Sequence, residues 1–158
     1  MSIEVGKAAP GFALASDTAG EVSLEALRGK PVVLYFYPKD DTPGCTTEAC
    51  DFRDRLDRVT AAGAVVLGIS RDSVARHEKF RGKYGLNFPL LSDPEAAVHA
   101  AYGAWGEKKL YGKVSIGAIR TTVLVDAAGV VRAVWPKVKV KGHADAVIAA
   151  LEALESLG

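Results

Sequence analysis

Long apolar runs, an imbalance of charge and clusters of cysteine are all missing from this sequence of 158 residues. Its longest apolar stretches, at 31–37 and 61–69, are far shorter than the roughly 20 residues that a membrane-spanning helix requires. The N-terminal stretch MSIEVGKAAP has neither the basic region nor the apolar run of a secretory signal peptide. We therefore expect no membrane span, no export, and a place in the cytoplasm.

The charges are balanced, because 20 Lys and Arg residues face 19 Asp and Glu residues. The resulting net charge of +1 creates no overall field that would recruit nucleic acid or an anionic membrane. The Gly-rich strand-to-helix fingerprint of a nucleotide site is missing as well. We expect a partner that is small, neutral or recognised locally, and no nucleic acid.

The three histidines, His77, His99 and His143, lie far apart in the sequence. None of them belongs to a C-x₂-C or H-x₃-H spacing, which is the usual arrangement of zinc ligands. We therefore expect no metal site and no other cofactor, and we interpret the histidines as solvated or core residues.

The chain has only two cysteines, Cys45 and Cys50. Two are too few for a framework of structural disulfides, and such pairs in intracellular chains are more often catalytic or redox-sensing. Buried, unreactive thiols are the plain alternative, because free cysteine is often a small core residue. These two residues are therefore the first candidates for a functional site.

The order of predicted elements alternates strand and helix within one domain covering residues 1–158. No repeat or linker divides the chain. We predict a strand at 31–37, a helix from 42 to about 62, a strand at 64–70, a helix at 73–84 capped by Gly85, a strand at 88–91, a helix at 94–102, a loop at 103–119, a hairpin of strands 121–126 and 130–135, and a helix at 143–157. Trp105, Tyr111 and Trp135 are interpreted as packing residues. This order predicts an α/β fold with a central mixed β-sheet flanked by helices, which is the thioredoxin-like arrangement.

Cys45 falls in the first turn of the helix that we predict to start at Thr42-Pro43. The thiolate is the reactive form of cysteine, and the free N–H groups and positive dipole end of a helix start stabilise it. Attack on a peroxide O–O bond would also need donors that stabilise charge on the two oxygens. Thr42 and Arg120 are the candidates, although an arginine at position 120 would equally suit an ordinary ion pair. Glu48 is left without an assigned role.

Oxidation of Cys45 by a peroxide gives a sulfenic acid, which condenses with a second thiol to form a disulfide. Cys50 is the only other thiol in the chain. Five residues apart in an intact helix, the two Cα atoms would be about 8.7 Å apart, beyond the ~7 Å that a disulfide can bridge. We therefore predict that closing the disulfide unwinds the helix around Cys45 and Cys50.

The segment PKDDTPGCTTEAC resembles the active-site motif of peroxiredoxins of the bacterioferritin comigratory protein, or peroxiredoxin Q, type. It contains Pro, three residues, Thr, two residues and Cys, with a second Cys five positions later. The resemblance extends over nearly the whole chain, through GKAAPGFAL, GISRDSVARHEKFRGKYGLNFPLLSD, YGAWGEKKLYGKVSIGAIRTTVLVD and KVKVKGHADAVIAAL.

The resemblance implies that Cys45 is the peroxidatic cysteine and Cys50 the resolving cysteine, and that Thr42, Arg120 and Pro38 form the peroxide pocket. It further implies a thioredoxin-like fold, no metal or organic cofactor, and reduction of hydrogen peroxide and organic hydroperoxides. Thioredoxin or a similar dithiol protein would recycle the disulfide, and the protein would be a monomer or weak dimer.

Two other functions compete with a thiol peroxidase. A thioredoxin-type disulfide oxidoreductase normally uses a C-x-x-C pair, whereas four residues separate the two cysteines here. A non-catalytic redox sensor or chaperone would use the oxidation only to change a surface. Peroxide turnover with a thioredoxin system distinguishes the three.

Overall fold

The fold is built on a mixed β-sheet of seven strands, seen in a computed structural model that describes residues 3–18 and 20–157. The strands are ordered β2-β1-β5-β4-β3-β8-β9 across the sheet. β3 and β4 are parallel, as are β4 and β5, whereas the other neighbouring pairs are antiparallel. Their bounds are β1 Ala13–Ser16, β2 Glu21–Ser23, β3 Val32–Phe36, β4 Val65–Ser70, β5 Leu90–Ser92, β8 Thr121–Val125 and β9 Val131–Trp135.

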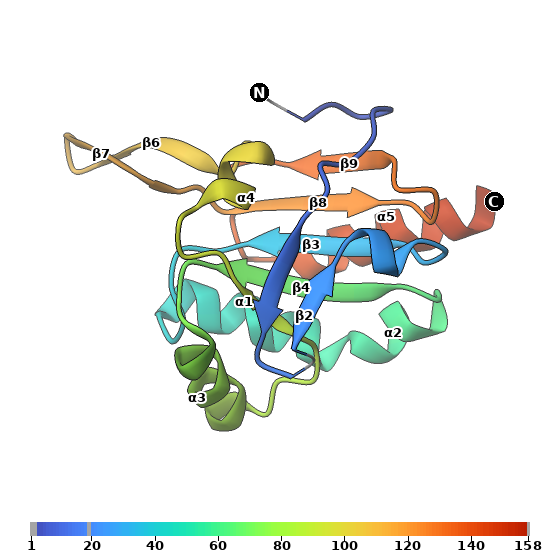
Figure 1. Cartoon of the computed structure of the whole chain (residues 1–158), viewed down its shortest axis with the longest axis horizontal. Coiled ribbons are helices and arrows are strands. Elements are labelled where there is room, and N and C mark those ends of the chain that lie inside the picture. The colour runs from blue at the N-terminus through green and yellow to red at the C-terminus, as the bar shows by residue number, and fades with distance from the viewer. Residues whose placement is uncertain (1–2, 19, 158) are drawn as a thin grey trace.

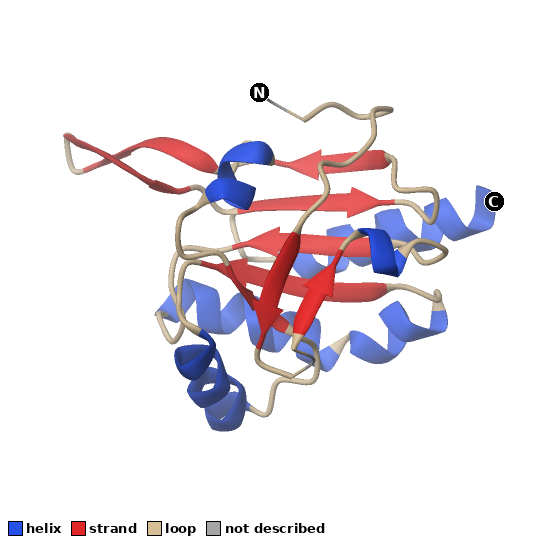
Figure 2. Ribbon diagram, viewed as in Figure 1, coloured by secondary structure: helices blue, strands red, loops and turns tan. Residues whose placement is uncertain are grey.

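Helices cover both faces of this sheet (Figures 1 and 2). Figure 1 shows α1, α2 and α5 behind the sheet, while α4 and the short 3-10 helix η1 lie in front of it. The helices are α1 Pro43–Asp54, α2 Leu56–Ala61, α3 Val74–Tyr84, α4 Ala97–Ala101, α5 His143–Leu157 and η1 Glu25–Leu27. The predicted central mixed sheet flanked by helices is therefore confirmed.

The central strand β3 is buried on both faces, as its unbroken apolar sequence predicts. Because side chains alternate along a strand, Tyr35 packs in the cluster that includes Phe52 of α1 and Ile148 of α5. Phe36 packs in the opposite cluster with Tyr102, which follows α4. Helix α1 thus begins at the carboxyl end of a strand that the core holds on both sides.

The predicted helix from 42 to about 62 is interrupted at Arg55, which separates α1 from α2. Arg55 has φ −113° and ψ 9°, and its N–H bonds to the Phe52 carbonyl three residues back. Its guanidinium binds Asp145 of α5 at 2.7 Å. Because neither Pro nor Gly marks this position, the local sequence gives no sign of the break.

The segment 103–119 was expected to be a loop, and this expectation is wrong. It forms an antiparallel hairpin of β6 Trp105–Leu110 and β7 Lys113–Ala118, which projects from the body of the molecule (Figure 1). Tyr111 and Gly112 form its turn with φ of 52° and 79°, as a type I′ turn requires. Tyr111 is 96% exposed, so its interpretation as a packing residue is also wrong.

Several smaller differences concern the ends of elements. Strands β1 and β2 and helix η1 occupy the N-terminal part, where no element was predicted. Helix α4 covers only 97–101 of the predicted 94–102, and strand β5 begins two residues later and ends one residue later than predicted. The hairpin of β8 and β9, the helix at 143–157 and the left-handed Gly85 cap of α3 are confirmed.

Candidate active site

Cys45 lies in the first turn of α1, where the sequence predicted it. Its side chain belongs to the core cluster, and the residue is only 1% exposed. The first backbone hydrogen bond of the helix runs from the Thr46 N–H to the Thr42 carbonyl at 2.8 Å. The N–H groups of Gly44 and Cys45 therefore have no partner within the helix and are available to an anion.

Thr42 occupies the N-cap position with extended backbone angles, φ −100° and ψ 156°. Its hydroxyl, however, does not cap the helix. It donates instead to the Lys39 carbonyl at 2.8 Å. With its proton used in this way, the Thr42 oxygen can only accept a further hydrogen bond, for example from the O–H of a bound molecule.

Arg120 approaches Cys45 from the short connection between β7 and β8. Its Nη2 lies 3.3 Å from the Cys45 sulfur, and its Nη1 lies 2.6 Å from Glu48 Oε1. The Val138 N–H donates to the Arg120 carbonyl at 2.9 Å and fixes its backbone. The Arg120 guanidinium thus contacts both the Cys45 sulfur and the Glu48 carboxylate, two groups of α1.

Glu48 is the group that sequence reasoning left unassigned. It lies one turn after Cys45 and is 1% exposed. Burial is the main cause that raises the pKa of its carboxyl to about 7, although Arg120 acts in the opposite direction. Its second oxygen, Oε2, has no hydrogen-bond partner among the described residues and lies 4.0 Å from His143 Nε2.

His143, the first residue of α5, lies next to the Glu48 carboxyl group. Its Nε2 lies 2.7 Å from the Thr122 hydroxyl of β8, and its ring packs edge-on against Phe52 and Trp135. Burial, followed by the positive charge of Arg120, lowers the pKa of His143 to about 4. The ring is therefore neutral at physiological pH and adds no charge beside Glu48.

Gly44 has no side chain, and the Arg120 guanidinium lies close to the position that a Cβ atom would occupy there. A Cβ atom at this position would stand 3.1 Å from Arg120 Nη2, which is closer than ordinary van der Waals contact. Because the contacted group is the end of a long side chain, the guanidinium would move rather than the helix. Gly44 is thus a residue that lets the guanidinium approach Cys45.

Cys50 is half-buried on the same helix as Cys45, and both cysteines are free thiols. The continuous helix between them keeps their Cα atoms about 8.7 Å apart, too far for a disulfide. A bond between the two sulfurs therefore requires α1 to open.

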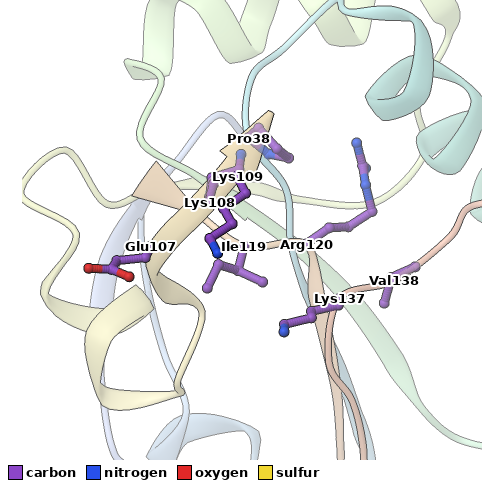
Figure 3. Close-up of a pocket in the computed structure, with 8 residues that line it drawn as sticks. All are labelled: Pro38, Glu107, Lys108, Lys109, Ile119, Arg120, Lys137 and Val138. Carbon is purple, nitrogen blue, oxygen red and sulfur yellow. The ribbon is translucent and has the colours of Figure 1, made fainter. Parts of the chain in front are cut away.

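A cleft of about 730 Å³ lies beside this group (Figure 3). Pro38 and Arg120 both line it, together with Ile119 and Val138, and three lysines and one glutamate stand at its walls: Lys108, Lys109, Lys137 and Glu107. In Figure 3 the Arg120 side chain points away from Lys137 and Glu107. Its guanidinium therefore links the cleft to the buried Cys45 sulfur.

The described residues show no membrane-spanning helix and no candidate metal centre. No helix in residues 3–18 and 20–157 combines the length and apolar character needed to cross a bilayer. In the same part of the chain, no three His, Cys, Asp or Glu side chains converge to hold a metal ion.

The structure thus brings most of the expected residues together. Cys45 and Arg120 are in contact, Thr42 begins the same helix, and Pro38 shares the cleft with Arg120. Cys50 lies on the helix but apart from Cys45. Sequence reasoning missed His143, for which no local signal exists because its partners come from other elements.

Comparison with known proteins identifies the family. The model of the AhpC/TSA family matches residues 5–134. The chain belongs to the AhpC/TSA family and, within it, to the Bcp or peroxiredoxin Q group. A putative peroxiredoxin bcp of Coxiella burnetii is 55% identical to this peroxiredoxin over 96% of the chain and 100% of the relative. Peroxiredoxin Bcp of Bacillus subtilis is 46% identical over 99% of this chain and 98% of the relative.

Solved structures agree with this relationship. Peroxiredoxin Q of Xanthomonas campestris matches with a TM-score of 0.87 and 47% identity, covering 91% of each chain. A bacterioferritin comigratory protein of the same organism, studied for its alkyl peroxide reduction activity, matches with a TM-score of 0.89 and 43% identity, covering 96% of this peroxiredoxin and 99% of that chain. The thioredoxin-like fold expected from the sequence is therefore confirmed.

Proposed function

We propose that this peroxiredoxin reduces hydrogen peroxide and organic hydroperoxides with the thiolate of Cys45. The protein is a thiol-dependent peroxidase. The single observation that carries the role of Cys45 is the 3.3 Å contact between its sulfur and the Arg120 guanidinium. The contact places the positively charged guanidinium, at the start of a helix, directly beside the sulfur that attacks the peroxide.

The thiolate attacks one oxygen of the peroxide, so that the S–O bond forms as the O–O bond breaks. The departing hydroxide or alkoxide takes up a proton, and Cys45 becomes a sulfenic acid. Negative charge on the oxygens is stabilised by the guanidinium and by the free N–H groups of Gly44 and Cys45. The Thr42 oxygen, whose own proton is committed to Lys39, accepts the O–H of the peroxide and orients it.

Cys50 then acts as the resolving residue. Its thiolate attacks the sulfur of the sulfenic acid, so that the disulfide forms as the S–O bond breaks, and the departing hydroxide takes up a proton to leave as water. Because an intact helix keeps the two residues apart, α1 unwinds in this step. A thioredoxin-like dithiol protein returns the disulfide to two thiols by exchange. We place this cycle in the cytoplasm, where such dithiols are kept reduced.

Peroxide consumption in the presence of a thioredoxin system tests this function. The wild-type protein should turn over hydrogen peroxide and an organic hydroperoxide. Cys45→Ser should abolish turnover, whereas Cys50→Ser should still consume one equivalent of peroxide and then stop. Full turnover by Cys45→Ser would refute the assignment. Disulfide reduction without peroxide consumption would instead favour a thioredoxin-type oxidoreductase, and oxidation without turnover a redox sensor.

A further inference from the structure

A second buried polar group, separate from the Glu48 pair, lies where β3 leads into α1. His77 of α3 is 0% exposed, and its Nδ1 lies 2.6 Å from Asp40 Oδ2. Its Nε2 lies 2.9 Å from the Leu91 carbonyl of β5. The Tyr37 hydroxyl donates to the other Asp40 oxygen at 2.5 Å.

The partners of His77 determine its protonation. A backbone carbonyl can only accept a hydrogen bond, so Nε2 carries a proton. The Asp40 carboxylate is likewise an acceptor, so Nδ1 carries a second proton. The other Asp40 oxygen accepts from the Tyr37 hydroxyl, so both oxygens of the carboxylate act as acceptors. His77 is therefore an imidazolium ion, buried and paired.

The electrostatics agree with this count of donors. Burial lowers the pKa of His77, but the hydrogen bond and charge of Asp40, the Leu91 carbonyl and the charge of Asp72 together raise it above its ordinary value. Asp72 faces the pair directly, because its carboxylate accepts the Asp40 N–H at 2.8 Å. Arg76 neutralises Asp72 at 3.0 Å.

Asp40 belongs to the segment 38–42, which joins β3 to α1 and contains both Pro38 and Thr42. The next residue, Asp41, has a left-handed φ of 60°, a conformation that few residues other than glycine, asparagine and aspartate adopt. Its carboxylate binds Lys83 Nζ at 2.8 Å and the Tyr84 hydroxyl at 2.7 Å. Helix α3 thus holds this segment at two consecutive residues, one buried and one exposed.

We propose that His77 is a positioning residue: as a buried imidazolium it fixes Asp40, and through Asp40 it keeps Pro38, Thr42 and the start of α1 in place. This role rests on the proposed function, in which α1 unwinds and rewinds in every cycle. The segment 38–42 stays anchored to α3 while the helix opens. Rewinding therefore begins from an N-cap that is already in position.

The protonation of His77 can be tested on the reduced wild-type protein by nitrogen NMR of its imidazole ring at mildly alkaline pH. Both ring nitrogens should carry protons under conditions where an exposed histidine has lost one. A single protonated nitrogen would overturn the proposal. This measurement does not depend on peroxide chemistry, so its outcome is separate from the fate of the proposed function.

The positioning role is tested by the rate at which peroxide oxidises Cys45 in a single turnover without reductant. His77→Asn keeps a donor for Asp40 but holds no titratable proton, and Asp40→Asn removes the charge of the carboxylate. We expect each variant to slow Cys45 oxidation about tenfold. Glu78→Gln, on the exposed face of the same helix, is the matched control and should leave the rate unchanged.

The pH profile separates positioning from a loss of fold. As pH rises through the pKa of His77, the ring loses its proton, so the wild-type rate should fall at alkaline pH. His77→Asn should lack this decline. Wild-type rates in both folded variants would overturn the proposal, and so would an alkaline decline that survives in His77→Asn. If neither variant folds, the protonation of the His77 ring in the wild-type protein still supports or overturns the proposal.

Discussion

Glu48 and Arg120 form an ion pair 2.6 Å long beside the Cys45 sulfur. The Glu48 carboxylate and the Cys45 sulfur therefore share one guanidinium, and both residues are only 1% exposed. Removing charges from water is costly even when they are paired, and the pKa of Glu48 near 7 reflects this cost. The pair holds Arg120 in place, and it makes the site sensitive to pH.

The stability of the protein should record the titration of Glu48. Because its pKa is raised in the folded protein, the folded state holds this proton more tightly than the unfolded chain. The stabilisation is complete below the ordinary pKa of the unfolded chain and is lost as pH rises through about 7. From about pH 5 to about pH 8, the unfolding free energy of the wild type should fall by up to about 3 kcal/mol more than that of Glu48→Gln.

Denaturant unfolding of the two proteins over this pH range measures the difference. Glu107→Gln, which replaces an exposed carboxylate at the cleft, is the control and should follow the wild type. Parallel pH curves for the wild type and Glu48→Gln would show that Glu48 does not titrate in this range.

Gly44→Ala should separate stability from activity. Alanine favours an α-helix over glycine by about 1 kcal/mol, yet its Cβ would press on Arg120 Nη2. We expect a protein that melts at the same or a higher temperature but oxidises Cys45 at least several-fold more slowly. Gly82→Ala, on α3 with no atom near its Cβ position, is the control and should keep the wild-type rate. An unchanged rate in Gly44→Ala would contradict the role of the Arg120 contact.

Opening of α1 should be visible by amide hydrogen exchange. In the disulfide form, amides of residues 46–54 should lose protection, because a Cys45–Cys50 bond is incompatible with an intact helix. Those of α3 should stay protected and serve as an internal control. Equal protection of α1 in the reduced and disulfide forms would show that the helix does not unwind.

His143 should report the same movement from the opposite side. Burial and Arg120 hold its pKa near 4 in the folded site, and Glu48 and Phe52, which lie against it, both belong to α1. When α1 unwinds, the ring gains access to water, and its pKa should rise toward the ordinary 6.5. Proton NMR titration of the reduced and disulfide forms measures both values. An identical low pKa in the two forms would indicate that α1 stays packed on His143.

The parts of the fold that could be predicted are those determined by local sequence. The apolar run of β3, the Gly85 cap of α3 and the amphipathic helix α5 all formed as expected. The turn of the β6–β7 hairpin escaped prediction because Tyr111-Gly112 is an uncommon pair for a type I′ turn. The break at Arg55 is not marked by Pro or Gly, and the Arg55 side chain binds Asp145, which lies 90 residues away.

The same distinction applies to the site. Cys45 and Thr42 could be placed because a helix start is visible in the sequence. The environment of Glu48 could not be, because Arg120 lies 72 residues along the chain. Likewise, His77 is an ordinary helix residue until the fold brings the Leu91 carbonyl to its ring. Charge state inside a protein depends on such contacts between distant residues.

Intact mass measurement after one equivalent of peroxide tests the division of roles between Cys45 and Cys50 most directly. The wild type should lose two hydrogen atoms, as expected for an intramolecular disulfide, and peptide mapping should join Cys45 to Cys50. Cys50→Ser should gain one oxygen atom at Cys45, and Cys45→Ser should be unchanged. Addition of oxygen to Cys50 in the Cys45→Ser protein, at the rate at which the wild type reacts, would contradict the account.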